Sequence, residues 1–373
     1  MKTLTPSIFD ELLQGDTATR LTIYLPVNKQ VAETNNNVLQ LKNMLKAIKT
    51  RHANLSALSS LLKPITEKLD DNELFRGHEG CIGFFVSSQG YFEILALPSC
   101  SEPFYLLDDC FYIVPLIDLL PKLDYYYILS FGKSTVKLFK GNYYGVEEIT
   151  LSSEIPTTME EALGDELTHN HLHPASGAGT GLHGYMEITD EKEIDSTRFF
   201  RIIDTALFER YFQQEPLPLI LSSVAENIAL FKKVSKNPFL IEDSIVISAK
   251  PVASPHLLQS LKEIIATRQA TNKQAIMERF GIAKAEKLGL DRLANVAISV
   301  IDKRAEHLLI GEGKKIHGVI DQESRSVKYF PESSQDILNQ LAVIAHGYGT
   351  KLHVVPSENG VSLAEGVACI NRY

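Results

Sequence analysis

A polar stretch near the middle of the chain contains three alternating histidines, His169, His171 and His173. On a β-strand, alternate residues share one face, so three imidazoles in this pattern could bind zinc. Pro174 follows directly, and no cysteine or carboxylate stands where it would complete the coordination shell, so the metal site is a weak candidate. The two other interpretations are exposed loop histidines and imidazoles that contact RNA by stacking or as cations.

Glycines follow the histidines at short intervals, and glycine lets the backbone approach a ligand closely. The run Gly177–Gly181 reads Gly-Ala-Gly-Thr-Gly and superficially resembles a dinucleotide-binding turn. That turn requires a strand before it and a helix that begins within it. Here polar sequence precedes the glycines and the next helix is expected only at about Ser196, which disfavours a dinucleotide site.

We therefore interpret the segment 168–190 as a loop that contacts a partner, with an unordered surface insertion as the alternative. The candidate contact residues within it are His171, His173, Gly177, Gly179, Gly181, His183 and Gly184.

Two arginines, Arg198 and Arg201, stand three residues apart on the helix expected after this loop. They could contact phosphates and brace the loop against RNA. The alternative is an ion pair at the surface with Asp195 or Asp204. Apolar residues at helical spacing are expected to form the buried face of the same helix: Phe200, Ile203, Leu207 and Tyr211.

Short apolar runs and helical periodicity divide the chain into three α/β blocks, 1–122, 123–250 and 251–373. The middle block opens with three short strands joined by tight breaks, which predicts an antiparallel meander. The last block alternates helices and strands, which predicts an α/β/α layer structure. The expected strands are 21–26, 81–86, 91–97, 125–131, 135–139, 143–149, 217–224, 245–247, 307–310, 327–330, 351–356 and 366–373, and the expected helices follow the apolar patterns at 38–48, 55–69, 225–234, 257–265, 290–303 and 334–346.

The composition is that of a soluble globular protein with 44% hydrophobic and 22% charged residues. No apolar run has the length of a signal or membrane segment, so we expect a cytoplasmic protein that does not contact membranes. The four cysteines form no CxxC pair, and in a reducing compartment we expect small core residues and no structural disulfide.

The net charge of −9 argues against a protein that simply coats nucleic acid. Its distribution is uneven, because the middle block carries −8 and the last block +2. The stretch from Lys232 to Arg292 is locally basic and predicts either a solvated helix surface or a face that contacts RNA phosphates. Its basic residues are Lys232, Lys233, Lys236, Lys250, Lys262, Arg268, Lys273, Arg279, Lys284, Lys287 and Arg292.

Several segments, in their order along the chain, resemble the archaeo-eukaryotic class of peptide-chain release factors and their relative Pelota. The chain is most similar to the bacterial branch of that family, which includes ribosome hibernation factors. The matching segments are the strand Thr22–Pro26, the helix Asn37–Asn43, the hairpin strands Tyr127–Ser130 and Val136–Gly141, the helix Arg198–Asp204 and the closing strand Gly366–Tyr373.

The resemblance implies an α/β (α+β) multidomain protein shaped somewhat like a tRNA. It implies an N-terminal α/β domain that faces the decoding centre and a ribonuclease H-like middle domain whose loop points toward the peptidyl-transferase centre. The C-terminal α/β/α domain would be of the kink-turn-binding ribosomal-protein type. The implied partners are the ribosome (rRNA at the A site) and a translational GTPase such as elongation factor Tu, and no cofactor is implied.

Release factors of this family carry Gly-Gly-Gln at the loop tip, where a backbone amide and the glutamine position the attacking water. The segment 168–190 has glycines but no Gly-Gly pair and no glutamine, and the chain lacks the Asn-Ile-Lys-Ser motif used in stop-codon decoding. We therefore expect ribosome binding in hibernation or rescue, by occlusion and without catalysis.

Two alternatives belong to other classes. The first is a hydrolase, either a peptidyl-tRNA hydrolase with a divergent loop or a metal-dependent nuclease. A nuclease needs clustered carboxylates around Mg²⁺, for which the middle strands offer only Asp124, Glu147 and Glu148. The second is a stress-response scaffold that binds only protein, which the acidic middle block would suit.

Overall fold

The computed structural model describes residues 1–14, 18–28, 31–69, 74–75, 78–100, 102–132, 135–166, 183–247, 254–331, 335–356, 363 and 365–373. The side chains of 31–35, 183–192 and 254 lie outside this description. The chain forms two compact units, Met1–Pro121 with Gln269–Tyr373, and Lys122–Arg268. The protein is a mixed α/β multidomain chain, as the sequence predicted. The division into 1–122, 123–250 and 251–373 stays a prediction.

The first sheet of the larger unit has the strand order β1-β4-β3-β2-β5. Its central strand β3 (Gly80–Ser87) pairs antiparallel with β2 (Arg20–Val27) and with β4 (Phe92–Leu97). The edge strands are β1 (Lys2–Thr3) and β5 (Phe104–Asp108).

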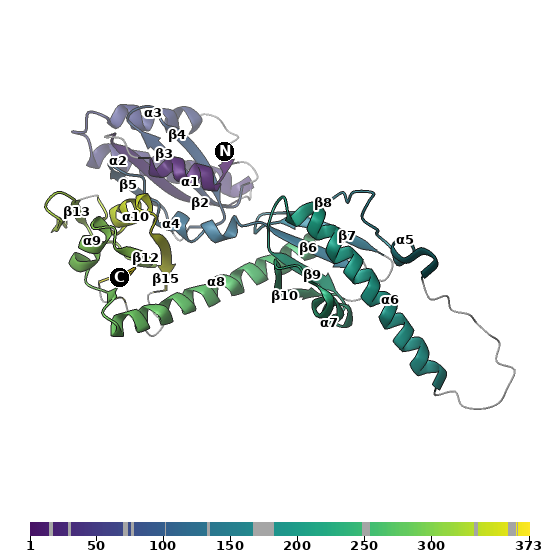
Figure 1. Ribbon diagram of the computed structural model, residues 1–373. Helices are drawn as coiled ribbons and strands as arrows, with labels where there is room; N and C mark the ends of the chain where they lie inside the picture. Colours follow the sequence, from purple (N-terminus) through teal and green to yellow (C-terminus); the bar gives the residue numbers. More distant parts are fainter. Residues whose placement is uncertain are drawn as a thin grey trace. The chain divides into compact units, whose positions relative to one another are not determined.

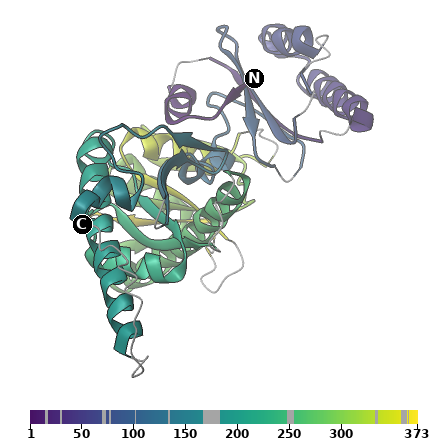
Figure 2. The same cartoon turned by 90° about the vertical axis from the view of Figure 1, so that its right-hand side faces the viewer.

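Two amphipathic helices, α2 (Val31–Arg51) and α3 (Leu58–Leu69), bury leucines and isoleucines against one face of this sheet. Figures 1 and 2 show both helices on the same side, and Figure 2 shows α1 (Pro6–Leu13) on the other. The start of α1 is fixed by Thr5, whose hydroxyl accepts a hydrogen bond from the amide of Ile8 at 3.2 Å.

A disulfide joins Cys81 of β3 to Cys100, which lies just beyond β4, with the two Cα atoms 5.5 Å apart. The expectation that no cysteine forms a structural disulfide is therefore wrong for this pair. Antiparallel pairing of β3 with β4 places Cys81 opposite Leu97, so the two cysteines meet at the end of a hairpin. Their separation of 19 residues gave no sign of this closeness. Cys110 and Cys369 are free thiols.

The second sheet of this unit has the order β11-β16-β12-β15. The strand β12 (Ala305–Gly311) lies between β15 (Lys351–Val355), which runs parallel to it, and β16 (Val367–Asn371), which runs antiparallel. Phe280 and Ile276 of α8 (Ser254–Ala285) pack on one face of the sheet. The remaining elements are β11 (Gly289–Leu290), α9 (Leu293–Ile301), the hairpin β13 (Gly318–Asp321) with β14 (Ser326–Tyr329), α10 (Ile337–Gly347) and the short α4 (Val114–Ile117) and η1 (Leu120–Lys122).

The smaller unit is built on a sheet with the order β10-β9-β6-β7-β8. The strands β6 (Tyr126–Phe131), β7 (Val136–Gly141) and β8 (Val146–Ile149) form the predicted antiparallel meander. The strands β9 (Leu219–Ser223) and β10 (Leu240–Val246) extend it in parallel. The helix α7 (Ala225–Val234) connects β9 with β10, and α5 (Met159–Leu163) and η2 (Gly164–Glu166) follow the meander.

Helices cover both faces of this sheet. Phe199, Phe200 and Ile203 of α6 (His183–Leu207) pack on one face together with Phe231 of α7. On the other face, Leu257, Leu261 and Ile265 of α8 (Ser254–Ala285) pack against Tyr126, Ile128 and Ile220. None of the helices, as far as the chain is described, has an apolar stretch long enough to cross a membrane.

The helix α6 runs from His183 to Leu207 and continues as the π-helical turn Phe208–Phe212. It begins thirteen residues earlier than predicted, so residues 183–190 are helical, which corrects the boundary of the predicted loop 168–190. Ser196 is no N-cap but a buried residue in the middle of the helix. The polar, weakly periodic sequence before Ser196 concealed the first part of the helix, because it lacks an apolar face of its own.

Candidate nucleic-acid interface

The helix α6 presents a stripe of exposed side chains opposite its buried aromatic face. Arg198 and Arg201 are exposed, and they lie between Ile194 and Ile202, which are 50% and 37% exposed. Residues 194, 198, 201 and 202 recur at the helical spacing that places them on one side of a helix. The stripe therefore combines two guanidinium groups with apolar surface.

Neither arginine forms an ion pair within the part of the chain that the structure describes. The predicted alternative, a surface pair with Asp204, is absent because Asp204 is 5% exposed and bonds elsewhere. Its Oδ1 accepts a hydrogen bond from the Ser235 hydroxyl at 2.6 Å, and its Oδ2 accepts from the amide of Lys236 at 2.8 Å. Asp195 is also buried, at 5% exposure.

A hollow on α6 is lined by Glu193, Ile194, Thr197, Arg198 and Arg201. The guanidinium is planar, always charged and weakly hydrated, and its parallel N–H groups match two oxygens of one phosphate. Two such groups one turn apart, next to exposed isoleucine, can contact neighbouring phosphates and the sugar between them. Glu193 at the edge of the hollow reduces the local positive charge.

Most of the predicted contact residues lie outside the described residues. These are His169, His171, His173, Gly177, Gly179 and Gly181. His183 and Gly184 belong to the first turn of α6, and only their backbone is described. The structure therefore brings Arg198 and Arg201 together and does not test the other members of the predicted loop site.

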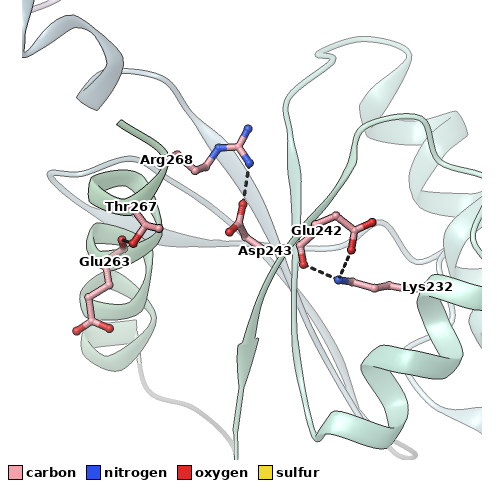
Figure 3. Close-up of polar contacts among 6 residues, drawn as sticks. All are labelled: Lys232, Glu242, Asp243, Glu263, Thr267 and Arg268. Carbon is pink, nitrogen blue, oxygen red and sulfur yellow. Dashed lines mark hydrogen bonds and ion pairs between the residues drawn. The ribbon is translucent and has the colours of Figure 1, made fainter. Parts of the chain in front are cut away.

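Five of the eleven basic residues between Lys232 and Arg292 pair with acids. Figure 3 shows two of these pairs in the smaller unit, Lys232 with Glu242 at 3.1 Å and Arg268 with Asp243 at 2.7 Å. Lys273 pairs with Asp118, Arg279 with Glu306, and Lys284 with Asp291.

Lys262, in the same stretch, lies over the ring of Tyr143 with its Nζ 5.1 Å from the ring centre. These partners reduce the positive charge that the stretch as a whole presents to an RNA backbone. The ion pairs therefore favour a solvated surface for this stretch over a face that contacts RNA. The helix α6 is the better candidate for a nucleic-acid interface.

Carboxylates on the meander do not form a metal site. Glu147 and Glu148 are successive residues of β8, so their side chains point to opposite faces of the sheet, and Glu148 pairs with Lys137 at 3.0 Å. Among the described residues, the one group of three side chains close enough to hold a metal ion is Asp108, Asp109 and Cys110, in the other unit. The nuclease alternative therefore has no support from the middle sheet.

The dinucleotide alternative is tested only in part, because residues 167–182 lie outside the described residues. The helix begins two residues after Gly181 and not at Ser196, so the expected late start was wrong. The described residues between β8 and Glu166 contain helical turns and no strand that could lead into a phosphate-binding turn.

Sequence reasoning missed the contribution of Ile194 and Ile202, which lie on the same exposed side of α6 as the arginines. Their spacing to Arg198, at i−4 and i+4, was visible in the sequence. It was not used because the helix was expected to start after Ile194.

Comparison with known protein families finds a match to the smaller unit. Residues 124–267, which almost coincide with the unit Lys122–Arg268, match the model of a class of bacterial proteins related to the release factors of archaea and eukaryotes. The matching model is that of the bacterial archaeo-eukaryotic release factor family 6. No curated protein sequence matches the chain.

Solved structures of archaeal proteins are similar over nearly the whole chain at low identity. A model of ribosome-bound archaeal Pelota and ABCE1 has 12% identity and a TM-score of 0.41, with 100% of this chain and 95% of that chain covered. Archaeoglobus fulgidus Pelota has 9% identity and a TM-score of 0.34, with 100% and 93% covered. The archaeal translation termination factor aRF1 has 13% identity and a TM-score of 0.24, with 98% and 96% covered.

Proposed function

We propose that this protein is a cytoplasmic ribosome-associated factor that binds in the A site and blocks it without releasing the peptide, in hibernation or in rescue. The observation that carries the proposal is the exposed pair Arg198 and Arg201, without ion-pair partners among the described residues, on the helix that directly follows the glycine- and histidine-rich segment. In release factors the corresponding segment carries the catalytic Gly-Gly-Gln, which is missing from 168–190 here.

The family match supports the proposal, because residues 124–267 belong to a release-factor family. The chemistry of the stripe supports it as well, since arginine beside exposed apolar surface suits contact with the backbone of folded RNA. In this proposal His171 and His173 of the loop, and His183 at the start of α6, contact rRNA. The middle domain has the ribonuclease H-like fold, and the C-terminal domain binds a translational GTPase such as elongation factor Tu.

Binding to ribosomes is tested by co-sedimentation of the purified full-length protein with vacant 70S particles. We expect the double variant R198E/R201E to bind about tenfold or more weakly. The slope of log affinity against log salt concentration should become shallower by about one for each phosphate that the variant no longer touches. The matched control is R210E/K233E, which makes the same change of charge at two other exposed positions of the unit. Ribosome binding that is absent, or equally weakened in both variants, would reject the proposal.

A peptidyl-tRNA release assay separates occlusion from hydrolysis. We expect the protein to release no peptide from ribosomes that hold peptidyl-tRNA and to inhibit release by an active factor. Release that disappears when His171, His173 and His183 are replaced by alanine would favour the hydrolase alternative. Crosslinking to RNA distinguishes the proposal from the scaffold alternative, which predicts crosslinks to protein alone.

A further inference from the structure

Two histidines face each other on neighbouring strands of the C-terminal sheet. His307 of β12 and His353 of β15 lie two register positions apart in the parallel pair, and Nδ1 of His307 is 2.8 Å from Nε2 of His353. On its other side, Nε2 of His307 is 2.7 Å from a terminal nitrogen of Arg279, which belongs to α8. The second terminal nitrogen of Arg279 donates to Glu306 at 2.7 Å. A continuous polar chain therefore runs from Glu306 through Arg279 and His307 to His353.

The proton positions in this chain follow from the chemistry of arginine. A guanidinium has no acceptor, so Nε2 of His307 must accept and the proton of that ring must sit on Nδ1. Nδ1 of His307 then donates to Nε2 of His353, which places the proton of the second ring on its own Nδ1. Burial, followed by the charges of neighbouring cations, lowers the pKa of both rings, that of His353 to about 4. At neutral pH both imidazoles are therefore uncharged, and the Nδ1–H of His353 is a donor whose direction is fixed.

A cavity of about 430 Å³ is lined in part by His353. His353, Arg279 and Lys273 line it together with the amides Gln269 and Asn272, while Asp118 is the one acidic residue among the described lining residues. Asp118 is already engaged, because its carboxylate pairs with Lys273 at 2.5 Å and its carbonyl accepts from Gln269 at 3.4 Å. The other lining residues are apolar, with Ile276 from α8 and Ile117 from α4 among them. The cavity thus offers donors and positive charge on one part of its wall and apolar surface on the rest.

We propose that this cavity binds an anionic small molecule of about nucleotide size, whose oxyanion is held by Arg279, Lys273 and the Nδ1–H of His353 and whose less polar body lies on the apolar wall. Ligand sites are typically concave, mostly apolar and provided with a few convergent polar groups, at volumes of roughly 300–1,000 Å³. Glu306 and His307 hold the guanidinium of Arg279 in place before any ligand arrives, so little side-chain freedom is lost on binding. The site lies outside the segment that matches the release-factor family, and it is independent of ribosome binding through α6.

Calorimetric titration of the full-length protein tests the site with defined probes. The probes are guanosine and adenosine 5′-monophosphate, benzoate, inorganic phosphate, and adenosine as the uncharged match. We expect a phosphate ester or the aromatic carboxylate to bind about tenfold or more tightly than adenosine, because the charged hydrogen bonds need the anion. Comparison of the affinities for the phosphate esters and for benzoate shows whether the site prefers the phosphate of a nucleotide or a carboxylate. Absence of binding by every anion at millimolar concentration would overturn the proposal.

Variants locate the binding. We expect R279M, K273M and H353F each to weaken binding of the best anion by about tenfold or more. The matched control is R268M. It removes a guanidinium that lies on the same helix but pairs with Asp243 and does not line the cavity (Figure 3). We expect R268M to bind the anion as the wild type does. Circular dichroism identifies any variant that fails to fold. If R279M fails to fold, K273M alone tests whether the anion binds in this cavity. Anion binding that R268M weakens as much as K273M would contradict the assignment.

The histidine rings supply a measurement that needs no ligand. Nitrogen-15 spectra of the imidazoles should show both His307 and His353 as the neutral tautomer with the proton on Nδ1, and the Nδ1–H resonance of His353 should shift on addition of the best anion. Rings with the proton on Nε2, or a spectrum unchanged at saturating anion, would show that the chain of hydrogen bonds only joins α8 to the sheet.

Discussion

The Ser235 hydroxyl donates a hydrogen bond to the Asp204 carboxylate at 2.6 Å, and this contact joins the end of α7 to the last turn of α6. The other carboxylate oxygen accepts from the backbone amide of Lys236 at 2.8 Å. One buried side chain therefore satisfies two donors just after a helix end, where the chain turns toward β10. The same arrangement keeps Asp204 from pairing with Arg201 and leaves that arginine at the surface.

Replacement of Asp204 by alanine should lower the free energy of unfolding by roughly 2–4 kcal/mol, because two hydrogen bonds to a charged acceptor disappear and the part-buried amide of Lys236 loses its partner. The measurement is urea unfolding of the full-length protein followed by circular dichroism. Thr205→Ala, at the adjacent exposed position of α6, is the control and should change the free energy of unfolding by less than about 0.5 kcal/mol. Equal stabilities of the two variants would show that Asp204 does not fasten the helix end.

Replacement of Asn339 in α10 should lower the free energy of unfolding as much as replacement of Asp204 does. Its side chain is fully buried, its Oδ1 accepts from the amide of Ile113 at 2.8 Å, and its Nδ2 donates to the carbonyl of Phe111 at 2.9 Å. Asn339→Leu leaves both backbone groups without a partner, so we expect a decrease of about 2–4 kcal/mol in the free energy of unfolding. Chemical unfolding provides the measurement, with His346→Ala near the end of the same helix as control. A decrease below about 1 kcal/mol would mean that water replaces the amide.

The disulfide between Cys81 and Cys100 should stabilise the N-terminal sheet. A cross-link that closes a loop of 19 residues is worth about 3 kcal/mol in the chain-entropy description. Titration of thiols in the unfolded protein should find the two cysteines Cys110 and Cys369 without reductant and all four with it. Reductant should lower the unfolding midpoint of the wild type and leave that of C81S/C100S unchanged. Four titratable thiols before reduction would show that the bond does not form.

The sequence predicted the elements that have a strong period or apolar character of their own. The three strands of the meander and the helix Ala225–Val234 were placed correctly to within a few residues, because alternation and amphipathic spacing are local properties. The first part of α6 was missed because its residues before Asp195 carry no apolar face. The pairs Asp204–Ser235 and His307–His353 join residues 31 and 46 positions apart, so no local pattern could indicate them.

The candidate site was predictable in the same uneven way. Arg198 and Arg201 were identified from their types and spacing, and the structure confirms that they share an exposed side of a helix. Their lack of ion pairs among the described residues could not be predicted, because it depends on where the chain after α7 places Ser235 relative to Asp204. Likewise, the basic stretch gave a count of cations, but only the fold shows that Lys273 and Arg279 face acids from distant segments.

The stability of the protein should depend on pH through His353. Burial and nearby positive groups lower the pKa of its ring in the folded state to about 4, below the ordinary value of about 6.5. Between these two values the unfolded chain binds a proton that the folded chain does not, so the free energy of unfolding rises with pH through this window and falls as the solution is acidified. The contribution of one such group is at most about 1.4 kcal/mol for each pH unit.

Asp108 changes the free energy of unfolding with pH in the opposite direction, so its contribution must be distinguished from that of His353. Burial, followed by the hydrogen bond with Asp109, raises the pKa of Asp108 to about 7, so the folded state binds the extra proton and stability falls as pH rises toward 7. Both H353Q and the wild type retain Asp108, so its effect cancels in the difference between their stability curves. We expect H353Q to rise less steeply than the wild type between about pH 4 and 6.5, by up to about 1.4 kcal/mol per pH unit, when urea unfolding is measured across this range. His256→Gln, at an exposed position of α8, should follow the wild-type slope, and a parallel slope for H353Q would show that the imidazole of His353 titrates as it does in water.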